Sequence, residues 1–229
     1  MAGGMEPLDR PIWFALQDRQ RHFAIGDGLA RRFQPDVSPF IACADDSREA
    51  LAAVSDLLGD RDAALFMQRT ETPIPPGTVR LDGGRGVQMV SDGLEPVKPP
   101  PGVVALTDAD APAMLALAAL TEPGPFRRRT HELSQFFGFK DKDGRLLAMA
   151  GERLKLPGMS EVSAVCTHPD AHGRGLAEQM TRYVAGVIAA RGETPFLHTY
   201  ADNAAAIRIY ERIGFRHRCF VEVTVIGRA

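Results

Sequence analysis

The chain has 229 residues, of which 45% are hydrophobic and 24% charged, a composition typical of a globular protein with one or two domains. The formal net charge of -2 indicates neither nucleic-acid binding nor attraction to an anionic membrane, and no apolar run reaches the ~18–20 residues of a membrane-spanning helix. Three widely spaced cysteines form neither a disulfide framework nor a zinc motif, and the first residues lack a secretory signal, so we expect a cytoplasmic protein without a metal site.

Residues 1–95 are expected to form a smaller α/β domain of unassigned role. Ser47 suits the N-cap of a helix, because its hydroxyl can accept a hydrogen bond from a free backbone N–H in the first turn. No catalytic constellation stands out in this half. The predicted elements are a helix over 47–58 and short strands over 63–67 and 86–90.

Four prolines between residues 95 and 102 separate this half from the rest of the chain. Proline lacks a backbone N–H and has a fixed φ, so such a run continues neither a helix nor a central strand. A stiff, extended linker is therefore predicted over 96–102, followed by a second domain over 103–229.

The second half alternates between strand and helix patterns, which predicts an α+β class built around a mixed sheet. The turn sequence at 141–144 predicts a hairpin between two of the strands. Strands are predicted over 103–106, 136–140, 146–151, 161–167, 196–200 and 221–226, and helices over 108–120, 174–190 and 204–213.

The most informative segment is the turn between the strand that ends at Thr167 and the long helix that follows. Pro169 ends strand pairing, and Gly173 and Gly175 allow a ligand to approach the backbone closely. A helix N-terminus presents free N–H groups and the positive end of the helix dipole. Together these features predict a cradle for an anion, most often a phosphate.

The run from His172 to Ala177 resembles the Q/R-x-x-G-x-G/A signature of the GNAT superfamily of N-acetyltransferases, with histidine where glutamine or arginine is usual. Downstream, Asn203, Ala206, Tyr210 and the pair Gly214-Phe215 resemble the family's N-x-x-A-x-x-x-Y-x-x-x-G-F block. The resemblance covers 103–229, and 161–177 is most similar to the branch with glycine N-acyltransferase-like domains. It implies a GNAT-like mixed sheet flanked by helices.

This resemblance implies that acetyl-CoA is the acyl donor and assigns residues to it. The backbone of the strand is expected to pair with the pantetheine arm, the glycine loop to surround the pyrophosphate, and the cap of the last helix to contact the cosubstrate. The strand residues are Val165, Cys166 and Thr167; the loop residues are His172, Gly173, Arg174, Gly175, Leu176, Ala177 and Glu178; the cap is Asn203.

The resemblance also implies two catalytic residues. Tyr210 corresponds to the family's general acid, and a phenol with a pKa near ~10 is protonated at neutral pH. Glu161 is the expected base, and His198 on the neighbouring strand is the rival base. The predicted function is an acetyl-CoA-dependent N-acetyltransferase, in which a primary amine attacks the thioester directly in a ternary complex.

Three points stay open at this stage. The acceptor is a small amine or an amino-acid-like molecule, for which the loop 121–126 and the arginines at 127–129 are candidate contacts. The alternative function is a non-catalytic acyl-CoA-binding sensor, and the protein is expected to be a monomer or a homodimer. A further hypothesis is that 1–95 is a degenerate second copy of the same fold, without the glycine loop that binds acyl-CoA.

Overall fold

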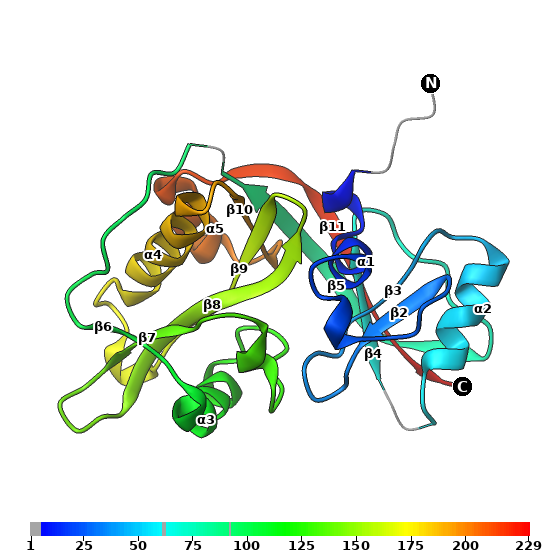
Figure 1. The fold of residues 1–229 in the computed structure, drawn as a ribbon, viewed down its shortest axis with the longest axis horizontal. Coiled ribbons are helices and arrows are strands. Elements are labelled where there is room, and N and C mark those ends of the chain that lie inside the picture. Colours follow the sequence, from blue (N-terminus) through cyan, green and yellow to red (C-terminus); the bar gives the residue numbers. More distant parts are fainter. Residues whose placement is uncertain (1–5, 61–62, 92) are drawn as a thin grey trace.

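The computed structural model describes residues 6–60, 63–91 and 93–229. In these residues one mixed sheet of eight strands runs through the molecule, in the order β4-β11-β5-β10-β9-β8-β7-β6, and a three-stranded antiparallel sheet β1-β2-β3 lies at one end (Figure 1). The strands are β1 (Ala24–Ile25), β2 (Ala30–Phe33), β3 (Ile41–Cys43), β4 (Ala64–Gln68), β5 (Thr78–Val90), β6 (Val103–Ala105), β7 (Phe137–Lys140), β8 (Leu146–Leu156), β9 (Met159–Thr167), β10 (Thr194–Tyr200) and β11 (Arg216–Arg228).

The second half of the chain has the predicted α+β architecture. Strands β7, β8 and β9 form an antiparallel meander, and helix α4 then crosses to β10, which is parallel to β9. Met180, Val184 and Ile188 of α4 are buried, because these positions lie on one face of a helix. The helices of this half are α3 (Ala111–Thr121), α4 (Leu176–Ala190) and α5 (Ala204–Ile213).

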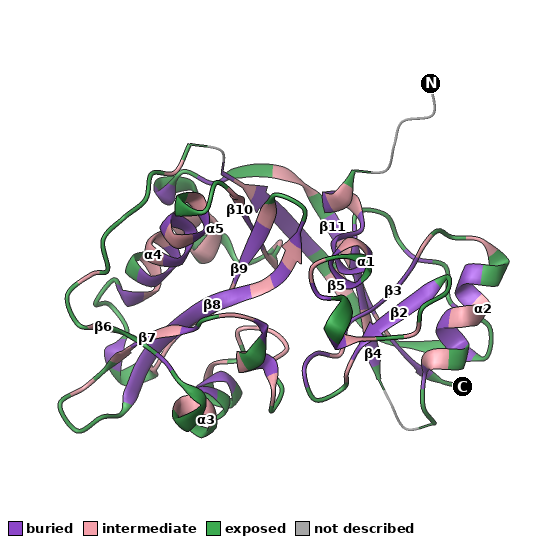
Figure 2. Ribbon diagram, in the orientation of Figure 1, coloured by how far each residue is buried: buried purple, intermediate pink, exposed green. Residues whose placement is uncertain are grey.

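Helices α3 and α4 cover opposite faces of the sheet at β9. Cys166 belongs to the apolar cluster of α3, whereas Val165 packs on the cluster of α4. This alternation is the ordinary pattern of a strand, in which successive side chains point to opposite faces. Figure 2 shows that β8 is largely buried, and Phe196 and Leu197 of β10 are buried as well, so the helices and the other half of the chain cover the middle of the sheet.

The first half of the chain repeats the order of elements found in the second half. Antiparallel strands β1, β2 and β3 are followed by a helix and then by β4, which meets the β3 segment through a parallel bridge between Phe40 and Leu65. Strands β7 to β10 have the same arrangement, and the degenerate second copy stays a prediction. The helices of this half are α1 (Pro11–Gln17) and α2 (Arg48–Leu57).

The turn before α2 corresponds to the glycine loop of the second half. It contains Asp45 and Asp46 and no glycine, and Ser47 caps the helix by accepting a hydrogen bond from Ala50 N at 3.2 Å. Two carboxylates at a helix N-terminus satisfy the helix dipole themselves and repel another anion. This turn therefore lacks the chemistry of a phosphate cradle.

Strand β5 joins the two halves into one sheet. Although it comes from the first 95 residues, it lies between β10 and β11 and pairs with both, for example through Phe196 with Val90 and through Val221 with Gly86. One apolar cluster also contains Phe33 and Phe40 together with Leu154. The two halves on either side of the boundary expected near residue 95 are therefore lobes of one structure. They share one sheet and part of one hydrophobic core.

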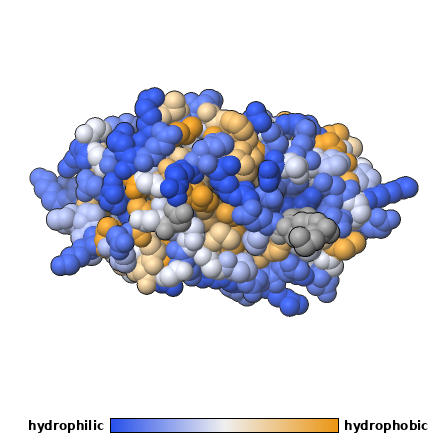
Figure 3. Space-filling view, turned by 90° about the horizontal axis from the view of Figure 1, so that it is seen from above, coloured by the Kyte–Doolittle hydropathy of each residue, from blue (hydrophilic) through white to orange (hydrophobic). Residues whose placement is uncertain are grey.

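The proline-rich segment 96–102 lies against α4. A Cβ atom on Gly186 would come within 2.6 Å of Val97 Cγ2, so the glycine lets the segment approach the helix closely. Among the described residues no helix is long and apolar enough to cross a membrane. On the face shown in Figure 3, hydrophilic side chains predominate and apolar ones form small, separate patches.

Candidate functional site

Strands β9 and β10 separate in the middle of the sheet. Their parallel pairing covers only Met159 with Thr194, Ser160 with Pro195, and Glu161 with Phe196. Beyond this point β10 continues along β5, and among the described strands none pairs with that edge of β9. The backbone of β9 after Glu161 is therefore open on this edge among the described residues.

A β-bulge marks the open part of β9. The pairing with β8 shifts between Cys166 and Ser163, and Ala164 between them has a left-handed φ of 52°. A bulge bends a strand and places an extra residue on it, which turns the edge away from its former neighbour. This bend explains why β9 leaves β10 here. A positive φ on a residue other than glycine also stores backbone strain, which proteins keep mainly at functional positions.

The glycine loop follows β9 as predicted. Gly173 and Gly175 have φ values of 76° and 71°, a conformation that favours glycine, and no other residue blocks the space around Gly173. Gly175 is the N-cap of α4, so the first N–H groups of this helix lack acceptors within the helix. The His172 ring lies 3.0 Å from the Thr167 carbonyl oxygen, which ties the loop to the end of β9.

The first turn of α4 is fixed by ion pairs that leave its amides free. The carboxylate of Glu178 pairs with Arg212 of α5 at 3.0 Å and with Arg182 at 3.7 Å. The Glu178 carboxylate is therefore occupied by these arginines, and its contact with an anion through the backbone N–H stays a prediction. A second hollow beside the loop is lined by Lys98, Arg182 and Gly175 among others, so the proline-rich segment brings a cation close to the helix N-terminus.

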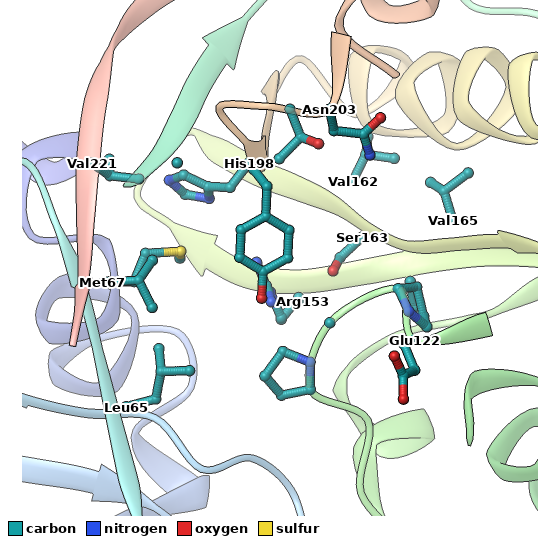
Figure 4. A pocket seen from close by; sticks show the side chains of 18 of the residues that line it. Leu65, Met67, Glu122, Arg153, Val162, Ser163, Val165, His198, Asn203 and Val221 are labelled. Atoms are coloured by element: carbon teal, nitrogen blue, oxygen red, sulfur yellow. The ribbon is translucent and has the colours of Figure 1, made fainter. Parts of the chain in front are cut away.

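The main pocket, about 160 Å³ in volume, lies where β9 and β10 separate. Its walls come from both lobes: Leu65 and Met67 lie on one side and Ser163 and Val165 on the other (Figure 4). Glu122, in the loop after α3, lies on the same side as Val165. The expected residues that line the pocket are Val165, Asn203 and Tyr210, whereas Cys166 and Thr167 lie outside the set of lining residues.

Tyr210 and Asn203 are brought together by α5. The Asn203 side chain accepts a hydrogen bond from Ala206 N at 3.1 Å and so caps the helix, while its amide lines the pocket. Tyr210 lies near the C-terminal end of the helix, and within the described part of the chain its hydroxyl has no hydrogen-bond partner. Burial raises the pKa of Tyr210 to about 12, so the hydroxyl carries its proton throughout the neutral range.

Cys166 is buried and belongs to the core under α3. Burial raises the pKa of its thiol to about 11, because a thiolate would be poorly solvated there. The nucleophile and metal ligand at a cysteine is the thiolate, so this residue is chemically inert near neutral pH. Its part in the site is the backbone that it contributes to β9.

Glu161 is located under the pocket and does not line it. Its side chain is fully buried, and its carboxylate accepts hydrogen bonds from Arg153 Nε at 2.9 Å, from His198 Nδ1 at 2.7 Å and from Leu154 N at 3.3 Å. Burial alone would raise its pKa, but the attraction of Arg153 and the hydrogen bonds outweigh burial and lower the pKa to about 2. Such a carboxylate is a weak proton acceptor, so the geometry argues against the expected role as base.

His198 lines the pocket, but both of its ring nitrogens already have partners. Nδ1 lies 2.7 Å from Glu161, and Nε2 lies 2.9 Å from the amide nitrogen of Gln88. The orientation of that amide is set by Arg218, which donates to Gln88 Oε1 at 2.9 Å, and by the Leu8 carbonyl, which accepts from Gln88 Nε2. The network therefore assigns the proton to Nδ1, and Nε2 accepts from Gln88 rather than facing a substrate.

The arginine run at 127–129 does not line the pocket. Arg128 pairs with Asp36 at 2.8 Å, and Arg129 pairs with Glu132 and donates to Gln34, so these side chains fasten the two lobes together. The arginine that lines the pocket is Arg153, which sequence reasoning missed. The available signal was the charged pair Glu152-Arg153, which directly follows the apolar run 146–151 of the strand.

The sequence matches the family of FR47-like proteins over residues 137–225. A mycothiol acetyltransferase from Mycobacterium sp. (strain JLS) is 31% identical over 167 residues, which cover 66% of this chain and 51% of the relative. Another, from Mycobacterium avium (strain 104), is 38% identical over 91 residues, which cover 34% of this chain and 29% of the relative. The chain thus spans about half or less of the length of these relatives.

Solved structures also match nearly the whole chain, among them the following two. A GCN5-related N-acetyltransferase from Kribbella flavida has a TM-score of 0.64 at 18% identity, covering 98% of this chain and 96% of its own, which shows a shared fold. A GNAT-family protein from Novosphingobium aromaticivorans DSM 12444 has a TM-score of 0.92 at 43% identity and covers 98% of this chain and 100% of its own. With this degree of identity along the whole length, the chain belongs to the GNAT family of acetyltransferases.

Proposed function

We propose that the protein is an acetyl-CoA-dependent N-acetyltransferase that transfers the acetyl group to a primary amine by direct attack in a ternary complex. The observation that carries the proposal is the position of Tyr210, whose hydroxyl has no partner in the described part of the chain and which lines the same pocket as the open, bulged part of β9. A thioester aligned along β9 would have an acid beside its sulfur and a hollow for the acceptor beside its carbonyl.

The donor site is built from backbone amides and cations. The N–H groups of Leu176, Ala177 and Glu178 would hold the pyrophosphate, because they start α4 and lack helical acceptors. Arg174 in the loop, with Lys98 and Arg182 in the adjoining hollow, adds positive charge where the phosphates of acetyl-CoA would lie.

The transfer step forms one bond and breaks another. The amine nitrogen bonds to the acetyl carbonyl carbon, the carbon–sulfur bond breaks, and the departing sulfur takes the Tyr210 proton and leaves as a thiol. The nitrogen releases a proton to pocket water, and the tyrosinate recovers one from solvent. Glu122 is the only carboxylate among the described residues lining the pocket, so it attracts the ammonium form of the acceptor, which gives one proton to pocket water and then attacks as the free amine.

Two measurements test this function. Thermal unfolding with and without acetyl-CoA reports on donor binding, since a ligand at ~100 times its Kd stabilises the folded protein by ~2.7 kcal/mol. Release of free CoA thiol in the presence of a panel of primary amines reports on transfer. Stabilisation by acetyl-CoA without release of CoA for any amine would favour the non-catalytic sensor, and the absence of both would reject the proposal.

A further inference from the structure

The pocket has three chemically distinct regions, and together they describe one class of acceptor. We propose, on the basis of the function above, that the acceptor is a free α-amino acid with an apolar side chain: its carboxylate binds Arg153, its amine faces β9, and its side chain lies against the first lobe. The three regions are arranged in this order in Figure 4, with Glu122 and Val165 on one side, Arg153 in the middle, and Leu65 and Met67 on the other.

The cationic region is the free end of a rigidly held arginine. Arg153 directs Nε and Nη2 to Glu161, and its guanidinium lies 4.8 Å from the centre of the Phe40 ring. Nη1 has no hydrogen-bond partner in the described residues, and the side chain lines the pocket while only 12% exposed. A hypothetical Cβ on Gly124 would be 3.9 Å from Nη1, so this nitrogen faces the wall of the pocket formed by the loop after α3.

The neighbouring network keeps Arg153 available to a second anion. Glu161 receives hydrogen bonds from His198 and the Leu154 backbone as well as from Arg153, so its negative charge is shared among several donors. Charge-assisted hydrogen bonds are about twice as strong as neutral ones, and a fixed guanidinium donor matches a carboxylate oxygen. The pair with Glu161 therefore orients Arg153 without using its Nη1 donors.

The anionic region sets the direction in which the acceptor binds. Glu122, an exposed residue at a left-handed φ of 47°, lines the pocket from the loop after α3, and its carboxylate has no hydrogen-bond partner in the described residues. It attracts an ammonium group and repels a carboxylate. With Glu122 at one position and Arg153 at the other, a zwitterion is oriented with its amine toward the strand that aligns the thioester.

The apolar region comes from the first lobe. Phe40, Leu65 and Met67 line the pocket together with Val221 and Val223 of β11, and no charged side chain lies among these five. A dry, apolar cavity of about 150 Å³ accommodates a molecule the size of benzene. This region is one part of the hollow of about 160 Å³, and its lining favours a branched or aromatic side chain over a long polar one.

Equilibrium binding to the CoA-saturated protein tests the proposal with L-leucine, L-leucinamide, 3-methylbutylamine and glycine as probes. These compounds change the carboxylate and the apolar side chain one at a time. We expect L-leucine to bind at least about tenfold more tightly than 3-methylbutylamine or glycine, with L-leucinamide in between. Equal affinity of L-leucine and 3-methylbutylamine would overturn the carboxylate assignment, and equal affinity of L-leucine and glycine would overturn the apolar assignment.

The variant Arg153→Lys locates the carboxylate site. Lysine keeps a positive charge for Glu161 but removes the Nη1 donors, so the preference for L-leucine over 3-methylbutylamine should fall to about twofold or less. Arg128→Lys, in an exposed pair outside the pocket, is the control and should retain the full preference. A full preference in Arg153→Lys would overturn the proposal.

If Arg153→Lys fails to fold, binding of the four compounds to the unaltered protein still tests whether the acceptor carries a carboxylate and an apolar side chain. Acetyl transfer to 3-methylbutylamine as fast as to L-leucine would reject the acceptor class and leave the transferase function intact. Failure of acetyl-CoA to bind would instead reject the function.

Discussion

Phe196 of β10 pairs with Glu161 of β9, and within the described sheet this is the last pair before the two strands separate. The buried network of Glu161, Arg153 and His198 lies at this point, directly under the pocket. A charged group that is fully buried needs partners, because desolvation otherwise costs several kcal/mol. We therefore assign Glu161 a structural role. It stabilises the point at which β9 and β10 separate, and it orients the side chains of Arg153 and His198 above it.

Glu161→Gln should destabilise the fold more than it slows the chemistry. Removing one partner of a buried pair typically costs about 3–5 kcal/mol, because the other charge is left uncompensated. Loss of a general base instead lowers kcat by about 10²–10⁴-fold in a folded enzyme. Urea unfolding and kcat per folded molecule distinguish these roles. Glu132→Gln, in a surface pair, should cost no more than ~1 kcal/mol; a stable but inactive Glu161→Gln would restore Glu161 as the base.

Stability should fall steeply in acid because of the same residue. The pKa of Glu161 is about 2 in the folded protein against an ordinary value of 4.5, so the unfolded chain binds the proton more readily. The stabilisation from Glu161 is therefore complete above about pH 4.5 and is lost as the pH falls from there toward 2. Thermal unfolding between pH 6 and pH 3 measures this slope. Glu161→Gln should unfold with a shallower slope, and an unchanged slope would contradict the assignment.

Tyr210→Phe should lower kcat by about 10²–10⁴-fold and leave acetyl-CoA binding unchanged, because the variant loses only the hydroxyl that protonates the leaving sulfur. With a pKa raised to about 12, this hydroxyl should produce no loss of activity in the pH profile below about pH 11. Steady-state kinetics and thermal shifts with acetyl-CoA check both statements. Equal loss of binding and turnover would indicate a packing role for the tyrosine.

Gly175→Glu should abolish the thermal shift that acetyl-CoA produces, because a carboxylate side chain would stand in the anion cradle at a left-handed position. Gly144→Glu is a matched control: Gly144 also has a positive φ of 83° and open space around it, but it lies in the β7–β8 turn. Both variants carry the same kind of backbone strain and added charge. A shift that persists in Gly175→Glu, or that disappears equally in both, would place the donor elsewhere.

Separate fragments of residues 1–95 and 96–229 should not fold independently. Without the first fragment, β10 and β11 lose β5 between them, and Phe196 loses its cover from the first lobe. Exposed strand edges and uncovered apolar side chains favour aggregation. We expect each fragment to lack sharp amide dispersion in NMR spectra, whereas the whole chain should unfold in a single transition. A folded 96–229 fragment that binds acetyl-CoA would show that the lobes are independent domains.

The parts of the site that could be predicted from the sequence are those carried by contiguous residues. The glycine loop before α4 and the pair Asn203 and Tyr210 on α5 each lie within one turn or one helix, so local motifs place them correctly. The α+β class could be predicted from hydrophobic periodicity, because this pattern too lies within single contiguous segments.

The parts that escaped prediction depend on pairing between distant segments. Glu161 was expected to face the cleft at the start of a strand, but β9 begins at Met159 and the bulge at Ala164 breaks its alternation. A bulge changes which side chains share a face, and no local pattern reveals it. Arg153 escaped prediction because its partner Glu161 lies on the neighbouring strand β9, and the apolar wall escaped because it comes from the first lobe.

The insertion of β5 between β10 and β11 also affects how the protein is made. A ribosome completes β5 early, but its two neighbours emerge only after synthesis has passed Thr194 and reached the final strand at Arg216. At translation speeds of about 5–20 residues per second, β5 waits on the order of 5–20 s with both edges unpaired. The pocket is therefore completed only after β11 has been synthesised, and any stalling or truncation before β11 leaves β5 with an unpaired edge that favours aggregation.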